Sequence, residues 1–234
     1  MSWLAKLYET YEAGVKLDFS GEEKLMPTSH TLQNAHINIV IDGDGNFKRA
    51  LVLEKTQVVL PATEKSAGRS SGEAPHPLAD KIQYVAADYP DFGGMKKGYF
   101  PGYENQLAKW CRSEYGHKRA VAVHRYIIKG HVVRDLADNS VLHIDENAML
   151  FRKWPENNGE PPAIFKVLPK NKGDIEQGDA LICWSVESDG EPDSATWQDE
   201  SLQQSGIAYD TQAGEDVGFC FVMGEEKPLA FNHP

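Results

Sequence analysis

The sequence predicts an α/β (α+β) fold with mixed, largely antiparallel sheets and several helices. Residues 28–53 alternate apolar and polar side chains on both sides of a DGDGN turn, which is the pattern of a β-hairpin. Apolar side chains recur at helical spacing in residues 3–11 and 103–115. The 234 residues are 41% hydrophobic, so the chain can bury a substantial core. The length allows one large domain or two small ones, and we expect one, spanning residues 1–234.

The first element should be a short amphipathic helix that begins near Ser2 and ends near Gly14. Its apolar positions form one stripe: Trp3, Leu4, Leu7, Tyr8 and Tyr11. Aromatic side chains on such a stripe usually pack into a core, and stacking on bases is the less common alternative. We therefore expect this face to be buried.

The hairpin places a set of polar side chains on one face of its first strand. When alternate isoleucines of this strand point inward, His36 lies on the opposite face, and Gln33 and Asn34 precede it where the strand begins. Gln and Asn can pair with an adenine edge, and His can donate a hydrogen bond to phosphate. The alternative is that these groups hydrogen-bond the nearby backbone.

A second apolar strand, at residues 57–65, leads into a predicted loop that extends to residue 85, because glycines and prolines interrupt any regular pattern there. The polar side chains of this loop are donors suited to phosphate: Lys65, Ser66, Arg69, Ser70 and Ser71. The guanidinium group of Arg69 can also form a bidentate hydrogen bond with a guanine edge. A solvated surface loop is the alternative.

A helix should begin near Pro77, with Leu78, Ile82 and Val85 on one face. Its N-terminus would point back at the loop. The helix dipole would then add positive potential beside the cations of the loop.

Basic side chains continue beyond this helix. Lys96 and Lys97 alternate with glycines and two aromatic residues, a composition that could clamp distorted nucleic acid or, alternatively, pack two rings against the core. Residues 118–134 fit a strand and a helix equally well, and either geometry permits a stripe of cations that includes Arg119 and Arg125. A solvated amphipathic element is the alternative for this stripe.

The remainder of the chain has an acidic, strand-containing pattern. The stretch GDALICWSVE is typical of a buried strand, and a further apolar strand is expected at residues 219–223. A helix is expected near residues 196–204, beside an acidic loop.

Charge is divided unevenly along the chain, although the formal net charge is -11. Residues 28–134, the basic section, carry fifteen Lys and Arg against ten Asp and Glu. Residues 135–234, the acidic section, carry six against twenty. This asymmetry fits a local phosphate-binding face whose acidic remainder faces solvent or partner proteins. Uneven surface charge without a role is the alternative.

Several classes of protein are disfavoured by the sequence. Cys111, Cys183 and Cys220 stand far apart, which argues against a disulfide framework and a zinc site. Apolar runs are too short to span a membrane, and the N-terminus is too charged for a secretory signal, so we expect a cytoplasmic protein. Known catalytic motifs are missing, and we expect neither enzymatic activity nor a cofactor or metal.

Four stretches resemble one protein family: SWLAKLYETYE, SHTLQNAHINIVIDGDGNFKRA, ATEKSAGRSSGEAPHPLADKIQYVAADY and MGEEKPLAFNHP. They are similar to the N-terminal region of the CRISPR-associated large subunit of the type I-C Cascade complex. The resemblance implies an isolated N-terminal domain, because the family continues into a long C-terminal portion that this chain lacks. It also implies a non-catalytic role, since target cleavage in that system belongs to a separate helicase-nuclease.

The resemblance implies a function in RNA-guided antiviral defence. The large subunit recognises the PAM, binds the adjacent duplex DNA and helps to open it so that guide pairing can begin. The implied partners are target double-stranded DNA, the crRNA 5′ handle, the other Cascade subunits and, as a further candidate, a viral anti-CRISPR inhibitor.

On this chain the DNA-binding role would fall on polar and basic side chains of the basic section: Lys65, Ser66, Arg69, Ser70, Ser71, Gln33, Asn34, His36, Lys81, Lys96, Lys97, Arg119 and Arg125. We expect them to form one continuous surface that faces nucleic acid. The alternative function is a protein-docking module that contacts the crRNA-handle-binding subunit without reading DNA.

Overall fold

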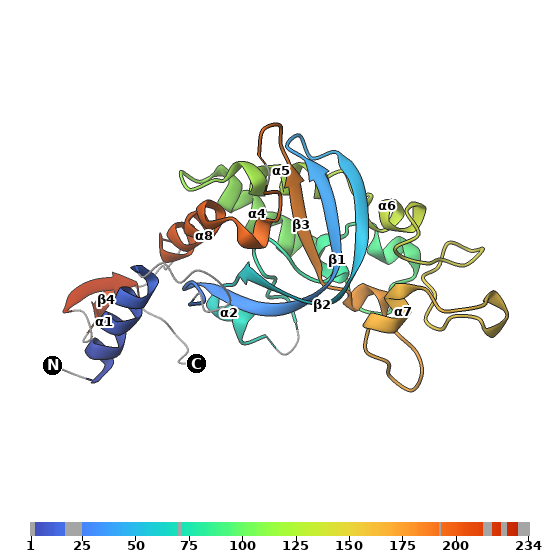
Figure 1. The fold of residues 1–234 in the computed structure, drawn as a ribbon, viewed down its shortest axis with the longest axis horizontal. Coiled ribbons are helices and arrows are strands. Elements are labelled where there is room, and N and C mark those ends of the chain that lie inside the picture. The colour runs from blue at the N-terminus through green and yellow to red at the C-terminus, as the bar shows by residue number, and fades with distance from the viewer. Residues whose placement is uncertain are drawn as a thin grey trace.

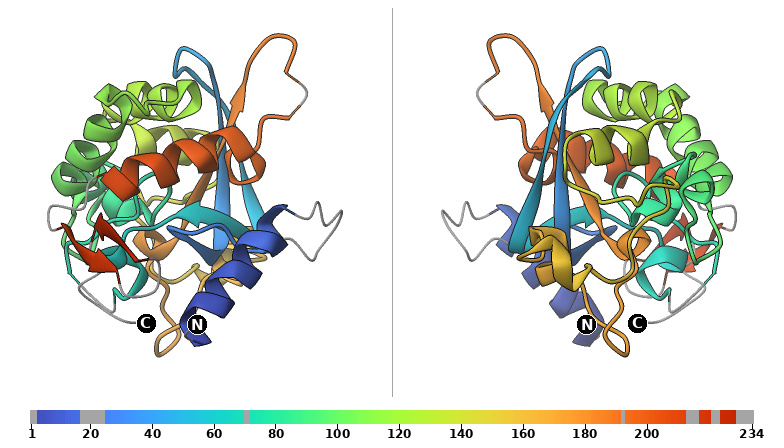
Figure 2. Two further views of the ribbon diagram at one scale, coloured as in Figure 1. Left: turned by 90° about the vertical axis from the view of Figure 1, so that its left-hand side faces the viewer. Right: turned by 90° about the vertical axis from the view of Figure 1, so that its right-hand side faces the viewer.

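The computed structural model describes residues 3–16, 25–69, 72–191, 193–212, 217–220 and 224–228. At its centre is a three-stranded sheet in the order β2-β1-β3, with the α4, α5 and α6 helices on one side (Figures 1 and 2). A separate two-stranded antiparallel sheet is formed by β4 (Val217–Cys220) and β5 (Glu225–Pro228). The predicted α/β (α+β) class with mixed, largely antiparallel sheets is confirmed.

The central strand β1 (His30–Asp42) joins the two halves of the chain. It pairs antiparallel with β2 (Phe47–Pro61), which confirms the predicted hairpin, and parallel with β3 (Ile182–Glu187). The side chains of Ile37 and Ile39 are fully buried in the core, as their alternation predicts. Because β3 comes from the acidic section, the basic and acidic sections share one sheet.

The two strands predicted at residues 47–53 and 57–65 form a single long strand, β2, which ends at Pro61. The pairing register shifts between Ala35 and Ile37, where residues 53–55 of β2 face the single residue His36. Lys55 takes a positive φ of 47° at this irregularity. A β-bulge therefore bends the strand without ending it.

Three helices form the layer behind the sheet: α4 (Phe100–Arg112), α5 (Lys118–Ile127) and α6 (Val132–Asp138). In α4 the side chains of Leu107 and Trp110 are fully buried, as predicted. The stretch 118–134, which the sequence left undecided, forms α5 and the start of α6, with a turn at residues 128–131 between them, and Val123 and Tyr126 reach the core together on one face of α5. Apart from α3, which is described next, the remaining described helical elements are α1 (Trp3–Lys16), α2 (Glu64–Ala67), η1 (Tyr89–Phe92), η2 (Glu156–Asn158), α7 (Ala163–Val167), η3 (Gln177–Asp179), η4 (Thr196–Gln198) and α8 (Glu200–Gln212).

The helix expected to begin near Pro77 begins only at Ile82 and is the single turn α3 (Ile82–Val85). The residues before it are extended, because they pair with residues 180–182. The N–H of Ile182 donates to the Asp80 carbonyl at 3.0 Å, and the N–H of Ile82 donates to the Ala180 carbonyl at 3.0 Å. The prediction of a helix start near Pro77 was therefore wrong.

The N-terminal helix α1 forms as predicted, but its apolar face is not buried. Trp3 is 75% exposed, Leu4 51% and Leu7 53%. The helix lies away from the central sheet (Figure 1). The prediction that this stripe packs into the core was wrong.

Near the C-terminus, the expected strand at residues 219–223 is described only as far as Cys220, within β4, and residues 221–223 lie outside the described part of the chain. The helix expected near residues 196–204 begins as the η4 turn and continues as α8 to Gln212. Within the described segments, the search for a helix long and apolar enough to cross a membrane finds none.

Candidate functional site

A pocket of about 480 Å³ lies beside the first residues of β1. We call it the lysine–tyrosine pocket. Thirteen side chains were predicted to bind DNA, and the structure describes eleven of them, since Ser70 and Ser71 lie outside the described residues. Six of these eleven line the pocket: Gln33, Ser66, Arg69, Lys81, Lys96 and Lys97.

The guanidinium of Arg69 is held inside the fold by a carboxylate. Its Nη1 and Nη2 donate to the two carboxylate oxygens of Asp80 at 2.7 and 2.8 Å, and Nη1 also donates to the Ala74 carbonyl at 2.8 Å. The Asp80 side chain is fully buried and accepts two further bonds from the backbone N–H groups of His76 and Lys81. A bidentate, charge-assisted pair of this kind fixes both groups. Arg69 thus organises the loop, and this does not match the expectation that it grips phosphate or a base edge.

Ser66 is also part of the local fold. It closes a capping box with Thr63, in which the Thr63 N–H donates to Ser66 Oγ at 2.9 Å and the Ser66 N–H donates to Thr63 Oγ1 at 3.2 Å. His76 Nδ1 lies 2.9 Å from the same Oγ. Burial lowers the pKa of His76 to about 4, so its ring is neutral at pH 7. The predicted loop is therefore shaped by a short helix and a buried polar network.

Four side chains form a column along the pocket. The Arg69 guanidinium lies 4.3 Å from the ring centroid of Tyr84, and Tyr84 stacks on Tyr99 with centroids 5.0 Å apart and an interplanar angle of 22°. The ammonium of Lys97 lies over the Tyr99 ring, 5.2 Å from its centroid. The column thus passes from a buried cation, through two rings, to an exposed cation. Tyr99 is partly buried and packs against the core, as the alternative interpretation expects, and it also lines the pocket.

The three lysines of the pocket differ in whether a carboxylate lies close enough to form an ion pair with them. Lys96 Nζ lies 2.7 Å from both carboxylate oxygens of Asp179, and Lys81 Nζ lies 3.3 Å from one of them. The Lys81 and Lys96 side chains are 38% and 46% exposed. Lys97 forms no ion pair with any residue that the structure describes. Because one carboxylate serves two lysines and the third has none, the mouth of the pocket keeps a positive charge.

The other predicted site residues lie elsewhere. Asn34 and His36 line a second cavity, of about 470 Å³, at the bulge itself. His36 Nδ1 accepts a hydrogen bond from the Leu181 N–H at 3.1 Å, which fits the alternative that this group satisfies the backbone. Lys65 is exposed on α2 and is not among the residues that line the lysine–tyrosine pocket.

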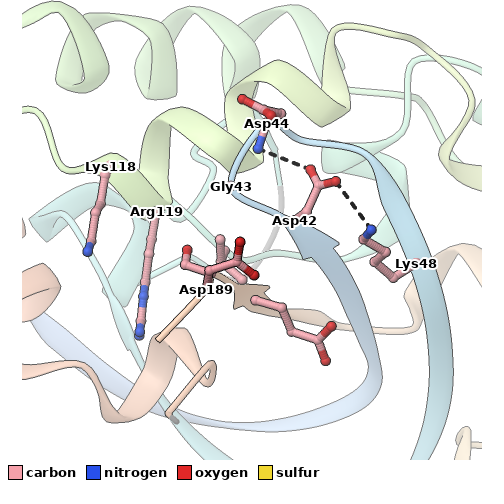
Figure 3. A pocket seen from close by; sticks show the side chains of 10 residues that line it. Asp42, Gly43, Asp44, Lys48, Lys118, Arg119 and Asp189 are labelled. Atoms are coloured by element: carbon pink, nitrogen blue, oxygen red, sulfur yellow. Dashed lines mark hydrogen bonds and ion pairs between the residues drawn. The ribbon is translucent and has the colours of Figure 1, made fainter. Parts of the chain in front are cut away.

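At the opposite end of β1, beside the hairpin turn, Arg119 lines a pocket of about 520 Å³ that mixes acids and bases (Figure 3). Arg125 lies against the same turn, next to Gly45. Arg119 Nη1 lies 2.9 Å from an Asp199 carboxylate oxygen, Nη2 donates to Glu191 at 3.2 Å, and the side chain is only 7% exposed. Arg125 lies 3.6 Å from Asp44. The expectation of one continuous cationic surface is therefore not met, because acidic side chains neutralise this end.

Sequence reasoning missed Gln83, which lines the lysine–tyrosine pocket. This residue is 6% exposed, and its Oε1 atom has no hydrogen-bond partner among the described residues. Its signal in the sequence is a single amide inside the apolar run of residues 82–86. Groups of three or more His, Cys, Asp and Glu that could hold a metal ion are not found in the described part of the chain.

Comparison with known proteins adds the family. A search of the curated proteins finds no match. A family model described as CRISPR-associated protein (Cas_Csd1) matches residues 7–234, which includes every strand and pocket described above. Because this match covers nearly the whole chain, the chain belongs to the CRISPR-associated protein (Cas_Csd1) family.

Proposed function

We propose that the chain is the N-terminal part of the large subunit of a type I-C Cascade complex, where it recognises the PAM, binds the adjacent duplex DNA and helps to open it. The proposal rests on membership of a CRISPR-associated family together with one observation: Lys81, Lys96 and Lys97 converge on one pocket. The proposed role is non-catalytic, requires no cofactor and is exercised in the cytoplasm, within a complex that contains crRNA and further protein subunits.

We propose that Lys96 and Lys97, rather than the loop residues, bind phosphate. Lys97 forms no ion pair within the described segments, so a phosphate would meet it without displacing a carboxylate from that part of the chain. Lys96 is 46% exposed and shares Asp179 with Lys81, so it can turn to a second phosphate while the carboxylate stays paired. Each such contact releases counterions from DNA, which makes binding depend on salt.

The test is a salt series. Fluorescence anisotropy would measure the affinity of the chain for a labelled DNA duplex in the wild type and in the double variant Lys96→Ala/Lys97→Ala. We expect an affinity loss of about tenfold or more, and a slope of log affinity against log salt that is shallower by about 2, because two phosphate contacts are removed. Lys109→Ala is the control, since Lys109 is exposed, belongs to the basic section and does not line the pocket. Equal affinity and slope in all three proteins would contradict the assignment.

The alternative function, docking onto the crRNA-handle-binding subunit, is favoured by the exposed apolar face of α1. Trp3, Leu4 and Leu7 are each more than half exposed on a helix that lies away from the core. Co-purification with that subunit tests it: Leu7→Asp should abolish capture, whereas Ala13→Asp, on the opposite face of the same helix, should retain it. Capture of both variants would remove this alternative.

A further inference from the structure

The lysine–tyrosine pocket contains a buried amide with an unmet hydrogen-bonding need. Gln83 is 6% exposed, and its Oε1 atom accepts no hydrogen bond from the described residues. Buried polar side chains nearly always have a partner, and each exception calls for an explanation. The last torsion of a Gln side chain is soft, so the amide can turn either its oxygen or its NH₂ group toward the pocket that it lines. A ligand can supply the missing partner.

The same pocket offers one face of an aromatic ring. Tyr84 stacks on the Tyr99 ring at a centroid distance of 5.0 Å, and the flexible side chain of Lys97 places its ammonium over that ring, 5.2 Å from its centroid. The backbone that carries the ring is held beside Gln83, because the Tyr99 N–H donates to the Gln83 carbonyl at 2.8 Å, and the ring itself stacks on Tyr84. An aromatic ring held in this way is a platform on which a planar group can stack, while the displaced ammonium becomes available to an anion.

A nucleotide combines a planar group that has hydrogen-bonding edges with an attached anion. Every nucleobase carries a donor beside an acceptor on at least one edge, which the amide of a Gln can match with its own acceptor and donor. The pocket volume of about 480 Å³ lies within the range of roughly 300–1,000 Å³ that is typical of small-ligand sites. The amide, the ring and the lysines therefore fit the base and the phosphate of one nucleotide.

The burial of Gln83 restricts how the base can be presented. A base in an intact duplex is stacked on both faces and shows only its groove edges, so it can neither stack on Tyr99 nor reach a side chain that is 6% exposed. A base that has left the stack can do both. We infer that the lysine–tyrosine pocket receives one unpaired nucleobase, stacked on Tyr99 with its edge on the Gln83 amide. This inference rests on the proposed DNA binding and adds how the opened strand is held.

The experiment compares two labelled DNAs of the same length: a fully paired duplex and the same duplex with a central run of mismatched bases. Anisotropy gives the affinity for each, and the ratio of the two affinities is the readout, because it cancels a general loss of DNA binding or of folded protein. For the wild type we expect a preference of about tenfold for the mismatched DNA, as one stacked base contributes roughly that much. Gln83→Leu and Tyr99→Leu should each lower the ratio severalfold.

Two variants serve as controls. Tyr99→Phe should keep the ratio, because phenylalanine retains the stacking face, and Gln57→Leu should keep it because Gln57 is exposed on β2 and does not line the pocket. A thermal unfolding curve for each variant shows that the compared proteins are folded. A ratio of one in the wild type, or an unchanged ratio in both Gln83→Leu and Tyr99→Leu, would overturn the inference. Failure of the wild type to bind the paired duplex would instead overturn the proposed function.

Discussion

At the scale of single residues, the Arg69–Asp80 ion pair determines the shape of the candidate site. Asp80 is fully buried and Arg69 is 11% exposed at the side chain, so removal of the guanidinium leaves a buried carboxylate without its counterion. We expect Arg69→Ala to lower the free energy of unfolding by about 3–5 kcal/mol. Urea unfolding measures this, with Lys65→Ala as the control, since that neighbour is exposed and should change stability by less than about 0.5 kcal/mol. Equal stability of the two variants would contradict the structural role of Arg69.

Protonation of His76 provides a second prediction at this scale. Burial lowers its pKa in the folded protein to about 4, against about 6.5 in an unfolded chain. Between these values the unfolded state binds a proton that the folded state does not, so stability falls as the pH is lowered from about 7 to 4. The loss from this residue is about 3 kcal/mol, at about 1.4 kcal/mol per pH unit.

His76→Gln should flatten that pH dependence, because it removes the titrating group while keeping a polar side chain near Ser66. Urea unfolding at several pH values gives the slope. Burial also lowers the pKa of other histidines, among them His30 and His143, so the stability of the variant should still depend on pH. The prediction is that this dependence is weaker than in the wild type. His131→Gln, at an exposed position, should keep the wild-type slope. An unchanged slope in His76→Gln would refute the prediction.

The residue scale also shows what the sequence could and could not predict about the site. The sequence shows that loop residues 65–69 include side chains that can donate hydrogen bonds. It does not show which acceptors the fold brings beside such donors. Asp80 lies eleven positions after Arg69, and Asp179 lies 83 positions after Lys96, so only the folded chain shows that these cations are already paired. Gln83 was overlooked because an amide in an apolar run carries no motif. Sequence patterns identify side chains that are able to bind a ligand. They do not identify which of these side chains are still free to do so after folding.

At the scale of elements, the hairpin turn is fitted against the backbone of α5. Gly45 has a φ of +76°, and a Cβ at this position would lie 2.7 Å from the Ala122 carbonyl oxygen and 2.9 Å from the Tyr126 nitrogen. Gly45→Ala would combine a strained backbone with a clash against atoms that cannot rotate away. We expect it to destabilise the fold by more than Gly190→Ala does, by a further margin of about 1–3 kcal/mol.

Gly190 is the matched position for this test, because its φ is +79° and a Cβ there would have no neighbour within 4 Å. Both variants carry the same backbone strain, so the difference between their thermal unfolding free energies isolates the contact between the hairpin and α5. Equal destabilisation would mean that the turn is free to move off the helix.

Elements whose pattern is local were predictable, and those decided by distant packing were not. The hairpin at residues 28–53 and the α4 helix follow from alternation and helical spacing alone. The start of α3 was misplaced, because residues 80–82 pair with residues 180–182, one hundred positions away. The apolar residues of α1 lie on one helix as predicted, but their spacing does not show whether another part of the molecule packs over them.

At the scale of the whole molecule, the two charge sections of the sequence are interleaved rather than separate. Asp179, from the acidic section, pairs with lysines of the lysine–tyrosine pocket, and Asp199 pairs with Arg119. The acidic section also supplies β3, the parallel neighbour of β1. The uneven charge along the sequence therefore does not give the folded molecule one basic face and one acidic face. Instead, acidic side chains pair with several cations of the basic section, whereas Lys97 in the lysine–tyrosine pocket forms no ion pair with the described residues, and this is the cation on which the proposed function depends.

This interleaving predicts that neither section folds alone. Without β3, the β1 strand loses its parallel partner along residues 37–42, and Trp184, which is fully buried, no longer packs against Tyr126 at a centroid distance of 5.8 Å. We expect a chain cut after residue 140 to show no cooperative urea transition. In the full chain, tryptophan fluorescence and far-UV circular dichroism should report coincident transitions, because one core contains both Trp110 and Trp184.

A chain cut after residue 212 is the control for this truncation. It keeps β3 and α8, and the described elements that it loses are β4 and β5, which pair with each other in a separate sheet. We expect it to retain a single transition whose midpoint stays near that of the full chain, because the central sheet and its helices remain complete. A cooperative transition in the 140-residue fragment, or two separated transitions in the full chain, would show instead that the basic section is an independent folding unit. The lysines of the pocket would then fold without Asp179, which pairs with two of them in the full chain. The pocket would therefore carry a larger positive charge in the fragment.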